Sequence, residues 1–128
     1  MSLAQATPVT FLFTRDREKA KAFYRDMLGL TFVGSDDHGE RFDMNGTPMR
    51  IVPIADHVPS AHTVLGWDVP DLSATAAELK AKGITFEIYE GFGQDENGIW
   101  SAPGGRAKIA WFLDPDGNNL SISEHATG

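Results

Sequence analysis

The chain has 128 residues, which is the size of one domain, and its lack of cysteine excludes disulfides and thiolate metal sites. No apolar run approaches the roughly 20 residues that cross a bilayer. A formal charge of −7 argues against nucleic acid and anionic membrane surfaces as partners, because both require a basic face. The charge mildly favours a cationic ligand, but its simpler role is to keep the domain in solution.

The N-terminal half predicts a strand, a helix and three further strands. VTFLFT (9–14) has the composition of a strand, and DREKAKAFYRDMLGL (16–30) follows with helical spacing of its apolar residues. Asp16 is placed to cap the first turn, and Gly29 suits the left-handed position after the helix. The runs LTFVG, ERFDM and MRIVPI then predict three strands, separated by SDDHG and NGT.

The C-terminal half repeats this order. TVLGWDV (63–69) predicts a strand and DLSATAAELKAKG (71–83) a helix that begins at Asp71. ITFEIYE, KIAWFL and NLSIS predict three strands, with an irregular glycine-rich loop from Gly91 to Arg106 in which Ile99 and Trp100 could form a short strand. DPDG, between the last two strands, has the residues of a tight turn.

The repeat predicts an α+β fold of one domain, 1–128. Two βαβββ modules, about 7–54 and 62–125, meet at a junction of about 55–61. Neither module can bury both faces of its own sheet, so we expect the two to form a curved mixed sheet around a shared cavity, with the helices outside.

Three features of the chain resemble the vicinal oxygen chelate superfamily. They are the tandem repeat, the stretch AFYRDMLGL after the first strand, and the stretch WFLDPDGNNLSI near the end. This superfamily includes glyoxalase I, extradiol dioxygenases, fosfomycin resistance enzymes and bleomycin resistance proteins. The resemblance covers nearly the whole chain and implies paired βαβββ modules. It leaves the function open, because this fold hosts several chemistries as well as simple binding.

The resemblance also implies where metal ligands would stand. In metal-using members, four strands supply His, Gln or Glu, and the matching positions here are Val9, Arg50, Val64 and Ser121. Two valines offer no donor atom, an arginine repels a cation and one serine is a poor ligand. We therefore expect no metal and no other cofactor.

Alternation along the strands predicts which side chains face the cavity. The polar and aromatic side chains that line the cavity are expected to be Phe11, Phe13, Arg50, Asp68, Trp100, Ser121 and Ser123. Such a mixture is usual for a small-molecule pocket. For Phe11 and Phe13, plain core packing is the alternative, and Arg50 could pair with Asp68. Trp111 is expected in the core.

Other chemistry has less support. His62 and His125 share the inward parity and could line one end of the cavity, although two strand-end histidines make a poor metal site. Ser121 and Ser123 have no adjacent His and carboxylate that would indicate a nucleophile. An acid–base pair of Asp68 and His62 is the remaining catalytic option.

The sequence thus predicts a metal-free protein that binds a small organic ligand. The alternatives are a glyoxalase-like lyase or dioxygenase with a site not evident in the sequence, and a module that acts through protein partners. The resemblance implies a homodimer. Since the N-terminus lacks the pattern of a signal peptide, we expect a cytoplasmic location.

Overall fold

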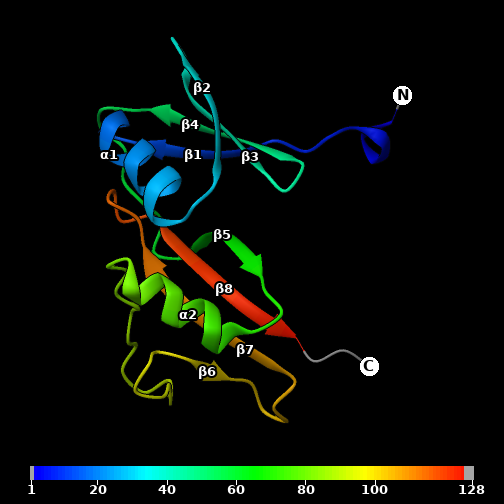
Figure 1. The fold of residues 1–128 in the computed structure, drawn as a ribbon, viewed down its shortest axis with the longest axis vertical. Coiled ribbons are helices and arrows are strands. Elements are labelled where there is room, and N and C mark those ends of the chain that lie inside the picture. The colour runs from blue at the N-terminus through cyan, green and yellow to red at the C-terminus, as the bar shows by residue number, and fades with distance from the viewer. Residues whose placement is uncertain (1, 126–128) are drawn as a thin grey trace. The chain divides into compact units, whose positions relative to one another are not determined.

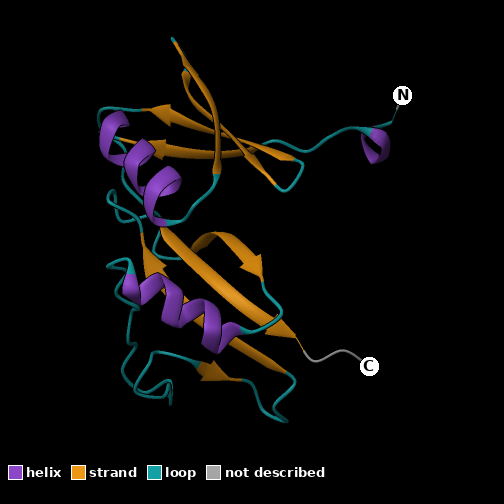
Figure 2. Cartoon of the chain, viewed as in Figure 1, coloured by secondary structure: helices purple, strands orange, loops and turns teal. Residues whose placement is uncertain are grey.

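The computed structural model describes residues 2–125 and divides into two compact units, Met1–Val58 and Pro59–Gly128. Each unit contains a four-stranded mixed sheet and one α-helix that packs against it (Figures 1 and 2). No helix within the described residues is long and apolar enough to cross a membrane.

The first unit follows the predicted order. After a short 3₁₀ helix, Leu3–Gln5, its elements are β1 (Thr10–Thr14), α1 (Arg17–Ala22), β2 (Thr31–Asp36), β3 (Gly39–Met44) and β4 (Thr47–Pro53). The strands lie in the order β1-β4-β3-β2, with β1 parallel to β4 and the other pairs antiparallel. Helix α1 continues into one π-helical segment, Phe23–Met27, which the sequence pattern did not separate from it.

The second unit has the same topology. Its elements are β5 (Thr63–Asp68), α2 (Leu72–Ala81), β6 (Trp100–Ser101), β7 (Ala107–Leu113) and β8 (Asn119–His125), in the sheet order β5-β8-β7-β6. Strand β5 is parallel to β8, as β1 is to β4. The α+β fold of two repeated modules predicted from the sequence is confirmed.

The helix caps and buried faces also agree with the sequence. The Asp16 carboxylate accepts a hydrogen bond from the backbone N–H of Lys19 (3.2 Å), and Asp71 does the same for Ala74 (3.1 Å). Each helix covers one face of its own sheet, and the core of each unit lies between that helix and that sheet. The buried apolar side chains of the two cores include Leu12, Ala20, Tyr24, Phe42, Met49 and Ile51, and Leu72, Ala76, Leu79, Phe112, Leu120 and Ile122.

The strand predicted at ITFEIYE (84–90) is wrong. This segment makes one isolated bridge, Phe86 with Phe112, and one hydrogen bond from Glu87 N–H to the carbonyl of Trp111 (2.8 Å). The strand that pairs with β7 is instead the short β6, where Trp100 lies opposite Ile109. The physical reason is that the side chain of Gln94 hydrogen-bonds to the backbone of Glu87 and Tyr89, where a neighbouring strand would otherwise have paired.

The DPDG turn is as predicted, and it is held by one carboxylate. Asp114 Oδ1 accepts hydrogen bonds from the backbone N–H groups of Asp116 and Asn118 (both 2.9 Å), and Asn118 Nδ2 donates to Asp114 Oδ2 (2.8 Å). These side chains are buried, and the polar groups that the turn removes from water are hydrogen-bonded to one another within the turn. It connects β7 to β8.

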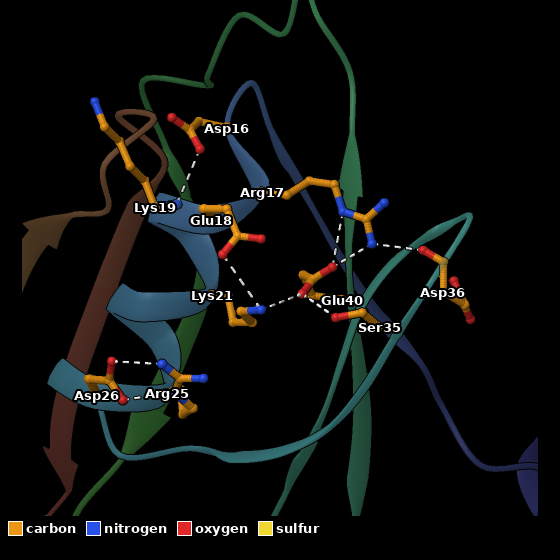
Figure 3. Close-up of polar contacts among 10 residues, drawn as sticks. All are labelled: Asp16, Arg17, Glu18, Lys19, Lys21, Arg25, Asp26, Ser35, Asp36 and Glu40. Atoms are coloured by element: carbon orange, nitrogen blue, oxygen red, sulfur yellow. Dashed lines mark hydrogen bonds and ion pairs between the residues drawn. The ribbon is translucent and has the colours of Figure 1, made fainter.

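A buried carboxylate joins α1 to the β2–β3 hairpin (Figure 3). Glu40 on β3 is 2 % exposed and ion-pairs with Arg17 of α1, whose Nε lies 3.0 Å from Glu40 Oε2. Ser35 donates a hydrogen bond to Glu40 Oε1 (2.6 Å), and Lys21 Nζ lies 3.9 Å from the same oxygen. Burial by itself would raise the pKa of Glu40, but Ser35, Arg17 and Lys21 outweigh it and hold the pKa below the ordinary value of 4.5.

Glu40→Gln should lower the free energy of unfolding at neutral pH by about 1–3 kcal/mol, because Arg17 and Lys21 lose a buried charged partner. A carboxyl whose pKa is lowered by folding stabilises the protein above its unfolded-state pKa, and this contribution fades as pH falls through the folded value. Wild-type stability should therefore decline below about pH 4.5 more steeply than that of the variant. Urea unfolding at several pH values measures this, with the exposed Glu18→Gln as a control; equal slopes would contradict it.

Candidate functional site

One face of the second sheet is left open by α2. Along β8, Leu120 and Ile122 point toward the helix and are buried, whereas Ser121 and Ser123 alternate with them and are half-buried. The register places Gly66 of β5 and Trp111 of β7 beside Ser121, so all three lie on the open face. The predicted inward parity of Ser121, Ser123 and Asp68 agrees with this register.

Four aromatic side chains gather on the β6–β7 side of this face. Trp111 contacts all three others, with centroid separations of 5.6 Å to Tyr89, 5.8 Å to Phe92 and 6.4 Å to Trp100. Phe92 also meets Tyr89 at 5.9 Å and Trp100 at 6.2 Å. We call these four residues the aromatic cluster. Trp111 is half-buried within it, so its predicted place in the core is wrong: strand alternation turns it away from α2.

A cavity of about 300 Å³ lies against three members of this cluster. Its lining residues are Ala61, His62, Thr63, Tyr89, Glu90, Phe92, Trp111 and Asn119. The volume is at the lower end of the range of small-molecule sites, and the mixture of rings with a few polar groups is typical of them. Phe92 is 50 % exposed, which leaves much of its ring available to a bound molecule.

A chain of hydrogen bonds forms the polar wall of the cavity. Thr63 Oγ1 donates to Asn119 Oδ1 (2.9 Å), and Asn119 Nδ2 donates to the hydroxyl of Tyr89 (2.9 Å). Thr63 and Asn119 are register partners at the start of β5 and β8, while Tyr89 comes from the loop. The amide of Asn119 therefore fixes the position of the Tyr89 ring relative to the sheet.

The loop that carries Tyr89 and Phe92 is held by the side-chain amide of Gln94. Its Nε2 donates to the carbonyls of Glu87 (2.9 Å) and Gly98 (2.8 Å), and its Oε1 accepts from the backbone N–H of Tyr89 (2.6 Å). One half-buried side chain thus replaces several strand hydrogen bonds. Gly91 (φ 86°) and Gly93 (φ 75°) flank Phe92 in the left-handed region, which allows the chain to turn sharply on both sides of this ring.

A second polar group lies at the other end of the same strands. Asp68 Oδ1 is 2.9 Å from His125 Nδ1 and accepts a longer hydrogen bond from Ser123 Oγ (3.4 Å). The carboxylate stands between the serine and the histidine, so the arrangement is not that of a serine nucleophile activated by histidine. Both Asp68 and His125 are largely exposed.

The extended β5 and its parallel register with β8 argue against two pairings that the sequence left open. Thr63 lies beside Asn119, and Asp68 lies beside Ser123. His62 therefore precedes one end of the parallel pair while Asp68 and His125 occupy the other, roughly 20 Å away at the rise of a strand. Neither a His62–His125 pair nor an Asp68–His62 acid–base pair forms.

The first unit places its predicted residues on one open face. Phe11 lies opposite Arg50, and Phe13 opposite Val52, on the side of the sheet away from α1. Phe11 is 53 % and Phe13 40 % exposed, so they are not plain core residues. Phe13 contacts the ring of His57 at 5.8 Å. The pKa of Asp36 is lowered mainly by a hydrogen bond from the backbone N–H of His38. The charge of Arg41 lowers it further, and the charge of Arg50 makes a smaller contribution in the same direction.

Comparison with known proteins agrees with this topology. The family model of the glyoxalase/bleomycin resistance protein/dioxygenase superfamily matches residues 6–122. The chain belongs to this superfamily. No curated protein matches it at a significant level.

Several solved structures share the fold at low sequence identity. A glyoxalase family protein from Bacillus anthracis is 17 % identical, with a TM-score of 0.73 over 94 % of this chain and 95 % of its own. The fosfomycin resistance protein FosX from Listeria monocytogenes is 13 % identical, with a TM-score of 0.74 over 95 % and 94 %. An antibiotic binding protein from Streptomyces is 20 % identical, with a TM-score of 0.68 over 95 % and 97 %. Identities this low establish the fold alone.

The four positions that the resemblance matches to metal ligands carry side chains that are unsuited to a divalent cation. Val9 precedes β1 and Val64 lies on β5, and neither has a donor atom; Arg50 is positively charged. Ser121 offers one hydroxyl, which lies over Gly66, where an added Cβ would come within 2.6 Å of its Oγ. Within residues 2–125, no group of three or more His, Asp or Glu side chains is arranged to hold a metal ion.

Sequence reasoning found only part of this site. It named Trp100 and allowed a short strand there, which is β6, but it missed Tyr89, Phe92 and Trp111 as one group with it. The two glycines around Phe92 were the available signal, since they mark a turn that presents a ring. The contact of Asn119 with Tyr89, which is thirty positions away, had no signal in the sequence.

Gln94→Ala should loosen the loop without unfolding the sheet. It removes three hydrogen bonds and leaves two carbonyls and one amide without their partner, which predicts a loss of about 1–3 kcal/mol in the free energy of unfolding. Hydrogen exchange at the Tyr89 amide should accelerate at least tenfold. Asn97→Ala, which removes one exposed hydrogen bond to Lys80, is the control. Unchanged exchange at Tyr89 would contradict the role assigned to Gln94.

Proposed function

We propose that the protein binds a small, partly aromatic or amphipathic molecule and that it does so without a divalent metal. The observation that carries the proposal is the cavity of about 300 Å³ against Tyr89, Phe92 and Trp111. Rings supply apolar area at a low cost in conformational entropy, and the Asn119 amide gives the wall a fixed polar edge. The unsuitable side chains at the four metal positions support the metal-free part of the proposal.

Two other hollows are less suited to this role. They measure about 110 and 290 Å³ and share Lys80 and Asn97, which are hydrogen-bonded to each other (2.9 Å). Neither contains more than one aromatic ring, whereas the proposed site contains three. The cavity at the aromatic cluster is therefore the better candidate for an organic ligand.

We retain the other residues expected from the sequence as candidate ligand contacts. On the first unit's open face these are Phe11, Phe13 and Arg50, and on the second unit's they are Asp68, Ser121 and Ser123. We also propose that the two modules act as one domain, that the protein is a cytoplasmic homodimer, and that it needs no cofactor. The resemblance to the superfamily supports the dimer, and the chemistry of Val9, Arg50, Val64 and Ser121 supports the absence of a metal.

Quinoline, a neutral bicyclic probe, should bind in the cavity with a millimolar or tighter dissociation constant, as expected for a fragment of this size. NMR titration should shift the Trp111 indole and Asn119 side-chain amide signals. Phe92→Ala should weaken binding about fivefold or more, because it removes one exposed ring. Ile88→Ala, an exposed change in the same loop outside the cavity lining, should leave affinity unchanged. Shifts confined to residues outside the lining would contradict the assigned site.

Metal ions should leave the stability of chelator-stripped protein unchanged. A specifically bound ion at about 100 times its dissociation constant adds about 2.7 kcal/mol to the free energy of unfolding, enough to raise the melting temperature by several degrees. Thermal melts with Zn²⁺, Ni²⁺, Mn²⁺ and Fe²⁺ test this. A selective, saturable rise would contradict the metal-free proposal and favour the alternative, a glyoxalase-like lyase or dioxygenase.

A further inference from the structure

The negative charge of the chain is concentrated in the unit that contains the cavity. Residues 59–128 include ten Asp and Glu against four Lys and Arg, which accounts for −6 of the total −7. The first unit, with eight acidic and seven basic residues, is almost neutral. The second unit is therefore the part of the chain with the more negative potential.

The lining of the cavity has the same sign. Glu90 lines it, and no described residue of the lining is a lysine or arginine. The four basic residues of the unit are Lys80, Lys82, Arg106 and Lys108, all outside the lining. Apart from Glu90, the ionisable side chains in the lining are His62 and Tyr89. An anionic ligand would therefore meet a carboxylate and no fixed positive charge.

The rings that line the cavity act in the same direction. The face of an aromatic ring carries partial negative charge and attracts a cation, most strongly for tryptophan. Tyr89, Phe92 and Trp111 all contribute to the lining, and Phe92 is half exposed. A molecule with an apolar body and a positive group would use both the area of the rings and their electrostatic attraction.

We propose that this cavity selects an organic cation, such as a quaternised aromatic amine or an alkylated ammonium. Its apolar body lies against Tyr89, Phe92 and Trp111, and its positive charge is attracted by these rings and by Glu90. This inference rests on the proposed function, because it names the class of ligand that the same cavity would take.

The test compares three probes of similar size and different charge: N-methylquinolinium, quinoline and 1-naphthoate, at mildly alkaline pH where quinoline is neutral. Calorimetry should show N-methylquinolinium binding about 2- to 30-fold more tightly than quinoline, and 1-naphthoate more weakly than either. Equal or tighter binding of quinoline or 1-naphthoate would overturn the charge selection while leaving the proposed function standing. Binding of none of the three would overturn both.

Two variants locate the selectivity, and both change exposed side chains. Glu90→Gln should lower affinity for N-methylquinolinium about two- to fivefold and leave quinoline unaffected. Phe92→Leu keeps an apolar side chain but removes a ring, so it should lower the ratio of cation to neutral affinity.

Glu96→Gln is the matched control, because it changes the net charge equally from the same loop but lies outside this lining. It should have less effect than Glu90→Gln on the affinity for the cation. An equal loss in both variants would overturn the role of Glu90 and leave only the overall charge of the unit.

Discussion

Each module has one helix of its own and a sheet with two faces, and this imbalance determines where function can reside. The helix buries Leu12 and Ile51 in the first unit and Leu120 and Ile122 in the second, so strand alternation turns the intervening side chains to the opposite face. On that face the first unit carries Phe11 and the second carries Trp111. Side chains that no helix needs for its own packing are available to contact a ligand.

The second unit departs from the repeat at the edge of its sheet, and the departure creates the cavity. A regular strand at residues 84–90 would have paired its backbone with β7 along its length. The amide of Gln94 instead bonds to Glu87, Gly98 and Tyr89, so the segment leaves the sheet and brings Tyr89 and Phe92 over Trp111. The side chain of Gln94 replaces hydrogen bonds between strands, so the backbone polar groups of this segment keep their partners. The segment can therefore leave the sheet and make room for the cavity.

The two units use charge in different ways. In the first, Glu40 is buried and compensated by Arg17, Lys21 and Ser35, so its charge holds α1 to a hairpin. In the second, the acidic residues are in large excess and Glu90 lines the cavity without a lysine or arginine among the lining residues. A buried charge needs its partners if the fold is to stay stable, whereas an acidic side chain beside a cavity attracts molecules of the opposite charge.

The sequence by itself determined the repeat, the helix caps at Asp16 and Asp71, the DPDG turn and the parity of Ser121 and Ser123. These features depend on residues close together in the chain, or on alternation within one strand. Tertiary structure alone decided that β5 runs parallel to β8, which separates His62 from His125. It also decided that Asn119 meets Tyr89 and that Gln94 displaces a strand. These contacts join segments whose register is set by the packing of whole elements, and no local pattern of residues records it.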